Sequence, residues 1–207
     1  MTGLCYARAA TAVQASRLEE WKGHGALLNG LGLVRHLPDW TCWIVGGVQR
    51  AHEAPYLEAL KILAADLRIS ERIRFVGQRS DVSRLLVAAD IFCQPNSGPE
   101  PFGIVFVEAL YAGLPVVATA MGAVQEIVDS SCGRLVPSAD AGALRDGLAE
   151  LIGSSRIRQR LGSRGPARAR ALCDPQQQLL QMQSVLSGVG VSTTYMGGPE
   201  VAQTLVF

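Results

Sequence analysis

The sequence lacks several features that would point to particular classes of protein. Its 207 residues carry 19 lysines and arginines against 18 aspartates and glutamates, so no global charge favours nucleic acid or an anionic membrane. No apolar run approaches the ~20 residues that span a bilayer. The first residues also lack the basic and apolar stretches of a secretory signal. We therefore expect a soluble, cytoplasmic globular protein.

Cysteine and histidine are too sparse to suggest a disulfide framework or a metal site. The five cysteines are odd in number and far apart, with no Cys-x-x-Cys, and the three histidines have no metal-ligand spacing. Such a pattern is typical of reduced thiols in the cytosol. The sequence therefore predicts neither a structural metal nor a disulfide.

What the sequence does contain is a regular alternation of short apolar runs and longer helical patterns. Strands are predicted at 11–16, 41–45, 72–76, 91–94, 115–119 and 133–136, and helices at 23–37, 53–67, 82–89, 104–112, 141–152 and 156–172. Asp81 is expected to cap one helix, and Gly113 to end another. This alternation indicates an α/β fold, a parallel sheet with helices on both faces. Such sheets bind ligands at the carboxyl ends of their strands.

The domain organisation follows from the same pattern. Residues 1–11 show no clear pattern, residues 12–172 contain the alternating elements, and residues 173–207 end in a stretch rich in glycine. We expect an irregular first segment, one ligand-binding domain, and a C-terminal helix followed by a Gly-rich tail.

The segment 99–110 carries the most informative chemistry. Pro101 biases Glu100 away from helical geometry, so Glu100 is expected in the loop before a helix. The amides at 102–104 then belong to the first helical turn, where backbone donors lack partners and favour anions or hydroxyls.

Glu108 is expected to be buried, since its neighbours on the helix are apolar and include no cation. A buried carboxylate costs several kcal/mol unless it is hydrogen-bonded, and paired ribose hydroxyls are suitable donors. The alternative is that Glu108 reaches solvent at the rim of the helix and that Glu100 is an ordinary loop acid.

These two acids, with seven residues between them around Phe102-Gly103, resemble the Glu-x7-Glu signature of the retaining group 1 glycosyltransferases. The resemblance runs from about residue 16 to about residue 172. It includes three further blocks, at 16–24, 77–82 and 112–119. It implies a Rossmann-like domain, the C-terminal, donor-binding half of a GT-B fold. It implies no cofactor, and the absence of Asp-x-Asp agrees with a metal-independent site.

The resemblance assigns Arg17 and Lys22 to the diphosphate of a nucleotide sugar. Both cations follow a predicted strand, and a departing nucleoside diphosphate needs its charge stabilised in the transition state. On this view Arg17, Lys22 and Glu100 are the catalytic candidates. The alternative is two solvated cations, with Lys22 facing Glu19.

The same resemblance implies substrate-binding roles for the other site residues. Glu100 matches the acid that contacts the donor sugar, and Phe102, Gly103 and Ile104 match the backbone contacts to sugar hydroxyls and phosphate. Glu108 matches the acid that binds ribose, and Arg79 lies where the family receives the nucleobase.

Members of this family have a second domain that binds the acceptor, and no region of this sequence matches it. We expect a nucleoside-diphosphate sugar as partner, a separate acceptor-binding domain, peripheral membrane contact only through that domain, and no nucleic acid. The main alternative is a non-catalytic module that binds nucleotide sugars or regulates a partner. A sugar-nucleotide epimerase is less favoured, because the spacing of Arg17 and Lys22 resembles the transferases.

Overall fold

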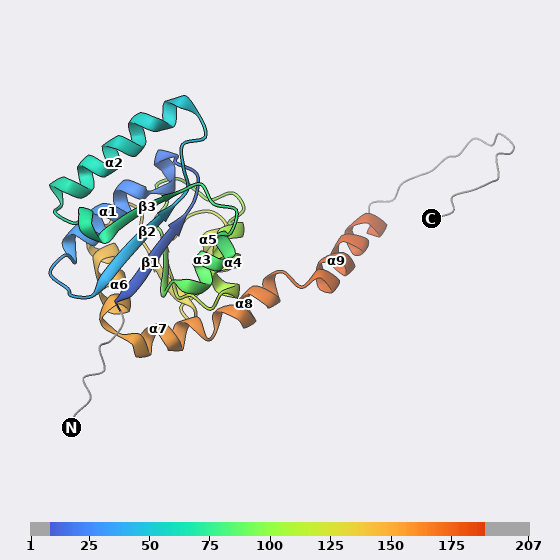
Figure 1. Ribbon diagram of the computed structural model, residues 1–207. Coiled ribbons are helices and arrows are strands. Elements are labelled where there is room, and N and C mark those ends of the chain that lie inside the picture. Colours follow the sequence, from blue (N-terminus) through green and yellow to red (C-terminus); the bar gives the residue numbers. More distant parts are fainter. Residues whose placement is uncertain (1–8, 189–207) are drawn as a thin grey trace, which may run out of the picture. The chain divides into compact units, whose positions relative to one another are not determined.

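The computed structural model describes residues 9–188, whose centre is a six-stranded sheet in the order β3-β2-β1-β4-β5-β6 (Figure 1). Every strand pairs in parallel with its neighbours. The strands are β1 (Ala10–Ala15), β2 (Trp40–Val45), β3 (Ile73–Gly77), β4 (Ile91–Gln94), β5 (Val116–Thr119) and β6 (Gly133–Val136). The predicted parallel sheet is confirmed, and β1 and β4 lie side by side at its centre.

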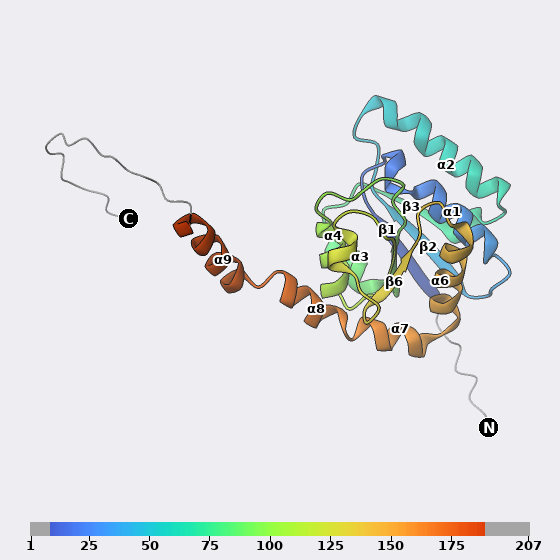
Figure 2. The same ribbon diagram turned by 180° about the vertical axis from the view of Figure 1, so that it is seen from behind.

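Helices cover both faces of this sheet, as the alternation of elements predicts. One face packs against α1 (His24–Leu33), α2 (Ala54–Asp66) and α6 (Ala141–Gly153). The other packs against α3 (Val82–Ala88), α4 (Ile104–Tyr111), α5 (Val124–Ile127) and α8 (Gly165–Leu172). The two layers lie on opposite sides of the strands in Figure 1, and Figure 2 shows α6 alongside α1 from behind.

Alternate residues of the central strands supply the two cores. Ala12 faces the core under α1, whereas Val13 faces the core under α4. Both residues are buried, which is typical of a parallel sheet that is covered on both sides.

Two predicted helices differ from the structure. The first ends at Leu33 rather than at residue 37, and turns follow it. The predicted helix at 156–172 is two helices, α7 (Ser155–Gly162) and α8. A Cβ on Gly162 would lie 2.1 Å from the carbonyl oxygen of Gly113, and one on Gly165 would lie 2.6 Å from that of Leu110. The helix breaks where these two glycines let the chain pass close to the end of α4.

The chain forms two units, residues 1–172 and residues 173–207. Within the second unit the structure describes α9 (Pro175–Gly188), a helix without charged side chains. The predicted Gly-rich tail beyond Gly188 and most of segment 1–11 lie outside the described residues. Between residues 9 and 188, no helix is long and apolar enough to cross a membrane.

Candidate functional site

The loops that follow β1, β3, β4 and β5 gather at one edge of the sheet, because parallel strands end on the same side (Figure 1). The loop after β1 carries Arg17 and Lys22, and the loop after β3 carries Arg79. The loop after β4 carries Glu100 and leads into α4, on which Glu108 lies. The fold therefore brings the site residues of three separate sequence blocks to one edge.

Lys22 and Glu100 form an ion pair at the centre of this edge, although 78 residues separate them in the sequence. The Lys22 Nζ donates to Glu100 Oε2 at 2.9 Å. The two side chains are only 12% and 7% exposed. The alternative in which Lys22 is a solvated cation facing Glu19 is therefore wrong.

A second donor reaches the same carboxylate oxygen. The Asn96 amide nitrogen donates to Glu100 Oε2 at 2.9 Å, and the Gln94 amide donates to Asn96 Oδ1 at 3.1 Å. Burial by itself raises the pKa of Glu100. The bonds from Lys22 and Asn96 outweigh burial and leave the pKa below its ordinary value. Glu100 is therefore an ionised acid in this site at neutral pH.

The backbone around Glu100 is held by the loop that follows β5. The Ala123 N–H donates to the Glu100 carbonyl at 2.8 Å, and Gly122 forms a bridge with Glu100. Gly122 has a φ of +60°, and a Cβ there would lie 2.4 Å from the Glu100 carbonyl oxygen. A residue without a side chain is required at this contact.

The β1 loop and the β4 loop also approach closely. A Cβ on Gly23, whose φ is +77°, would lie 1.8 Å from the Pro95 carbonyl oxygen. The Ser97 N–H donates to the Trp21 carbonyl at 2.9 Å, and the Lys22 ammonium lies 3.9 Å from the centre of the Trp21 ring. This packing places Lys22 over the β4 loop, within reach of Glu100.

Arg17 is the more accessible of the two candidate phosphate ligands. Its side chain is 54% exposed and pairs with Glu19 at 3.0 Å. Because the pair lies at the surface, it contributes little to stability, and a ligand can compete for the guanidinium.

A cavity of about 500 Å³ lies beside this cluster, a volume typical of small-molecule sites. Its lining includes Arg17, Gly46, Gln78, Arg79, Val105 and Glu108. At its wall, the Arg79 guanidinium donates two bonds of 2.8 Å to the Asp81 carboxylate. Asp81 occupies the N-cap position of α3 as expected, but its side chain binds Arg79 and makes no capping bond.

Glu108 is exposed, contrary to the expectation of a buried carboxylate. The helix α4 buries only the side of Phe106, Ala109 and Leu110. Its other side, including Ile104 and Tyr111, is open, and Glu108 lies there at the wall of the cavity. The apolar composition of α4 therefore does not bury Glu108, and Glu100 is the acid that the protein buries.

The three residues at the start of α4 also differ in burial. Phe102 and Ile104 are 75% and 60% exposed, whereas Gly103 is buried with a φ of +81°. Gly103 is the N-cap of α4, and its backbone N–H helps to hold the pKa of the Glu100 carboxyl below its ordinary value. The first amides of a helix have no partner within it, so they favour an anion or a hydroxyl.

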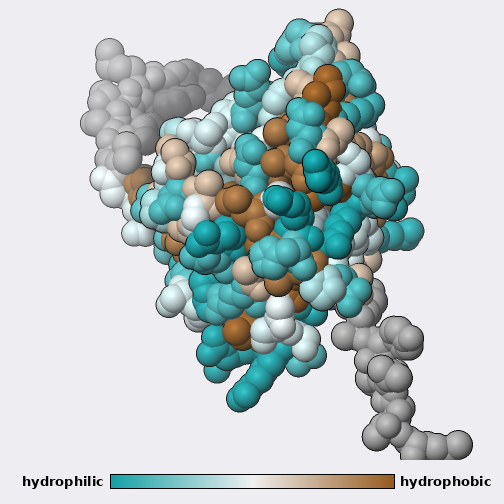
Figure 3. Space-filling model, turned by 90° about the vertical axis from the view of Figure 1, so that its left-hand side faces the viewer, coloured by the Kyte–Doolittle hydropathy of each residue, from teal (hydrophilic) through white to brown (hydrophobic). Residues whose placement is uncertain are grey.

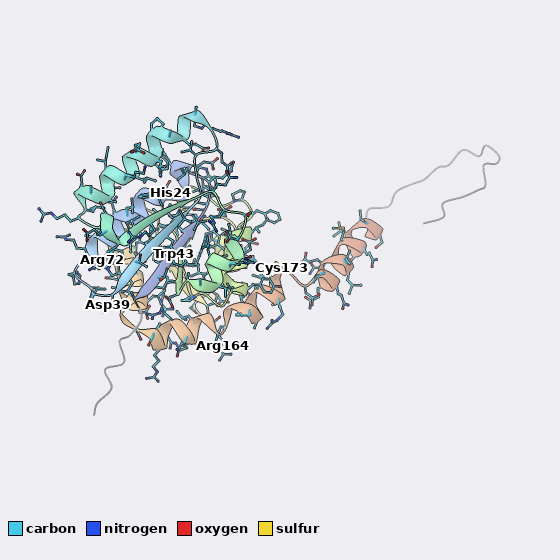
Figure 4. All side chains as sticks on the ribbon, viewed as in Figure 1. His24, Asp39, Trp43, Arg72, Arg164 and Cys173 are labelled. Atoms are coloured by element: carbon cyan, nitrogen blue, oxygen red, sulfur yellow. The ribbon has the colours of Figure 1, made fainter. Side chains whose placement is uncertain are left out.

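Buried polar side chains beneath these loops were missed in the sequence. His24, at the start of α1 beneath α2, lies 3.1 Å from Ser16 Oγ and 3.4 Å from the Tyr56 hydroxyl (Figure 4). Burial lowers its pKa to about 4, and the nearby Lys22 adds to this effect. The Gln14 amide donates to the Lys22 carbonyl at 2.7 Å. Gln14 is a polar residue inside an otherwise mainly apolar strand, and that pattern could have indicated a buried polar side chain.

A larger cavity, of about 660 Å³, lies along α1 and the start of α6. Its lining is mainly apolar and includes Ala26, Leu33, Leu67 and Leu144. Figure 3, which views the molecule from the left-hand side of Figure 1, shows hydrophobic side chains at the surface between hydrophilic ones. The cavity touches Asn96, but Arg17, Arg79 and Glu108 line only the smaller cavity, so the smaller cavity is the better candidate for a nucleotide.

A parallel sheet with helices on both faces, and with paired cations and acids at its carboxyl edge, defines a Rossmann-like domain of the GT-B type. Residues 6–168 match the family model described as Glycosyl transferases group 1. The chain therefore belongs to the group 1 glycosyltransferases.

Similar proteins agree with this membership. Over 151 residues the chain is 39% identical to the phosphatidyl-myo-inositol mannosyltransferase of Mycobacterium leprae, covering 71% of this chain and 38% of that protein. Over 160 residues it is 32% identical to a GDP-mannose-dependent phosphatidylinositol monomannoside mannosyltransferase of Mycolicibacterium smegmatis, covering 72% and 40%. The chain thus spans about two fifths of these relatives.

A solved structure shares the fold. The chain superposes on Anabaena HepE in complex with UDP-glucose with a TM-score of 0.78 at 28% identity, covering 87% of this chain and 49% of HepE. The fold of this chain thus corresponds to about half of that protein.

Proposed function

We propose that this chain is the donor-binding part of a retaining glycosyltransferase and that it binds a nucleoside-diphosphate sugar. The observation that carries the proposal is the buried Lys22–Glu100 pair, which lies at the carboxyl edge of the sheet. Arg17 links this edge to the cavity that Arg79 and Glu108 line. A nucleotide sugar needs both environments, a charged site for diphosphate and sugar and a cavity for the nucleoside.

Arg17 and Lys22 would bind the diphosphate. Two cations on one loop, beside the first amides of α4, offer an anion several donors at once. As the bond to the sugar breaks, negative charge grows on the departing diphosphate, and donors fixed in advance stabilise that charge. Lys22 is already held by Glu100, so it is oriented before the ligand arrives.

The two acids would take different parts of the ligand. Glu100, with the backbone at 102–104, would position the donor sugar. Glu108, exposed at the cavity wall, would accept hydrogen bonds from the ribose hydroxyls, and Arg79 would lie near the nucleobase. These roles fit the named relatives, of which one depends on GDP-mannose and another was solved with UDP-glucose.

In the whole protein, the glycosyl group would pass to an acceptor held by a further domain, with retention at the anomeric carbon. The acceptor domain is proposed because the chain covers only 38% of its M. leprae relative. We propose that peripheral membrane contact comes through that domain and that the donor half lies in the cytoplasm.

Thermal unfolding with and without ligand tests the proposal. The chain is heated with UDP-glucose, GDP-mannose or ADP-glucose, each matched by the corresponding nucleoside. A ligand that binds only the folded state, at a hundred times its Kd, stabilises it by about 2.7 kcal/mol. At least one nucleotide sugar should raise the unfolding temperature more than its nucleoside does.

A single variant tests the division of roles. Glu108→Ala should keep the fold, because the side chain is exposed, and should weaken binding of the nucleoside diphosphate. If no nucleotide sugar shifts the wild-type unfolding temperature, the proposed function is wrong. Unchanged affinity in Glu108→Ala would remove only the ribose role.

A further inference from the structure

Two glutamines are completely buried at the ends of the two central strands. Gln14 lies in β1 and Gln94 ends β4, and both are 0% exposed. Each donates its amide N–H toward the site, and each leaves its Oε1 buried without a hydrogen-bond partner. Across residues 9–188 the only other buried side-chain polar atom in that state is Trp40 Nε1. Native proteins keep few such atoms, so each one needs an explanation.

The direction of the chain from Gln94 to Glu100 is fixed by chemistry. An ionised carboxylate only accepts, so Asn96 must turn its amide nitrogen toward Glu100. Asn96 Oδ1 then faces the other way and needs a donor, which the Gln94 amide supplies. Gln94 Oε1 is left over at the end of this chain, buried and without a hydrogen-bond partner.

An apolar side chain at residue 94 would avoid the unpaired oxygen. The rest of β4 is apolar, and its neighbour β5 carries Val116, Val117 and Ala118. The amide at this position leaves one buried oxygen unpaired while it supplies Asn96 with a donor, so its effect is to orient Asn96 and, through Asn96, Glu100. Features that reduce stability are typical of functional sites.

We propose, resting on the proposed function, that Gln94 and Asn96 are positioning residues that set the affinity of this site for the sugar part of the donor. Asn96 and Lys22 both bind Glu100 Oε2, which fixes the orientation of the carboxylate. A carboxylate held in this orientation would be the acceptor for the sugar hydroxyls. Without Gln94, Asn96 Oδ1 loses its donor, and the amide turns away from Glu100 to find another.

The test compares a nucleotide sugar with its bare nucleoside diphosphate by titration calorimetry. The probes are UDP-glucose against UDP, and GDP-mannose against GDP. In Gln94→Met, which keeps the length of the side chain and removes the amide, we expect at least a fivefold weaker affinity for the nucleotide sugar. Affinity for the diphosphate should stay within twofold, and the variant should remain folded at the temperature of the titration. Asn96→Ala should show the same selective loss of sugar affinity.

The control is Trp40→Phe, which removes the third buried polar atom without a partner, at the start of β2 and away from the site. It should leave the ratio of the two affinities unchanged. Equal losses for sugar and diphosphate in Gln94→Met, or no loss, would overturn the positioning role. If the wild type binds neither nucleotide sugar, the proposed function fails first, and the positioning role fails with it.

Discussion

Replacing Lys22 with methionine would leave the Glu100 carboxylate buried without its cation. At 2.9 Å and an effective dielectric constant of about 20, the attraction between the two charges is about 6 kcal/mol. Desolvation of both groups cancels part of this, and breaking a buried pair typically costs about 3–5 kcal/mol. Asn96 still donates to Glu100, so we expect Lys22→Met to lower the free energy of unfolding by about 3 kcal/mol.

A double-mutant cycle with Glu100→Gln separates the pair from its surroundings. Glu100→Gln alone leaves an ammonium that lies over Trp21 and is 12% exposed, so a cost of about 2 kcal/mol is expected. Removing both charges should cost less than the two single changes together, with a coupling of about 2 kcal/mol. The free energies come from urea unfolding of the four proteins. Single changes that add to within about 0.5 kcal/mol would refute the buried pair.

Three further predictions concern other residues of the site. The pKa of His24 is lowered to about 4, so the unfolded state binds the extra proton below about pH 6.5, and stability falls as the pH drops. Between pH 7 and pH 5 the free energy of unfolding, measured with urea, should fall by about 2 kcal/mol more in the wild type than in His24→Gln. An equal dependence on pH in the two proteins would contradict this prediction. Gly23→Ala should destabilise the protein strongly, since its Cβ would meet the Pro95 carbonyl, whereas Gly25→Ala, with open space around it, should not. In calorimetry, Arg17→Ala should lower the affinity for a nucleoside diphosphate more than the affinity for the nucleoside. Equal losses of the two affinities would point to a folding defect.

The fold could be predicted from the sequence because its signals are local. Runs of about five apolar residues give the strands, and the residues between them give the helices. Gly113 ends α4 with a φ of +76°, as expected for a glycine after a helix. The break between α7 and α8 was missed, because it depends on Gly162 and Gly165 passing close to another element.

The sequence predicts which residues belong to the site, but not which of them are buried or how they pair. The sequence singles out Glu100 and Glu108, but which of them is buried depends on which side of α4 packs against the sheet. An eight-residue helix with apolar residues all round gives no clear answer to that question. The pairing of Lys22 with Glu100 depends on the order of the strands, which no local pattern contains.

The central claim is that this chain binds a nucleoside-diphosphate sugar through its phosphates, its nucleoside and its sugar together. Titration calorimetry of the wild-type chain with UDP-glucose and GDP-mannose, each beside its diphosphate and its nucleoside, tests the claim most directly. We predict one-to-one binding of at least one nucleotide sugar, tighter than its diphosphate, which in turn binds more tightly than its nucleoside. Binding of neither nucleotide sugar, or equal affinity for nucleotide sugar and nucleoside, would contradict it.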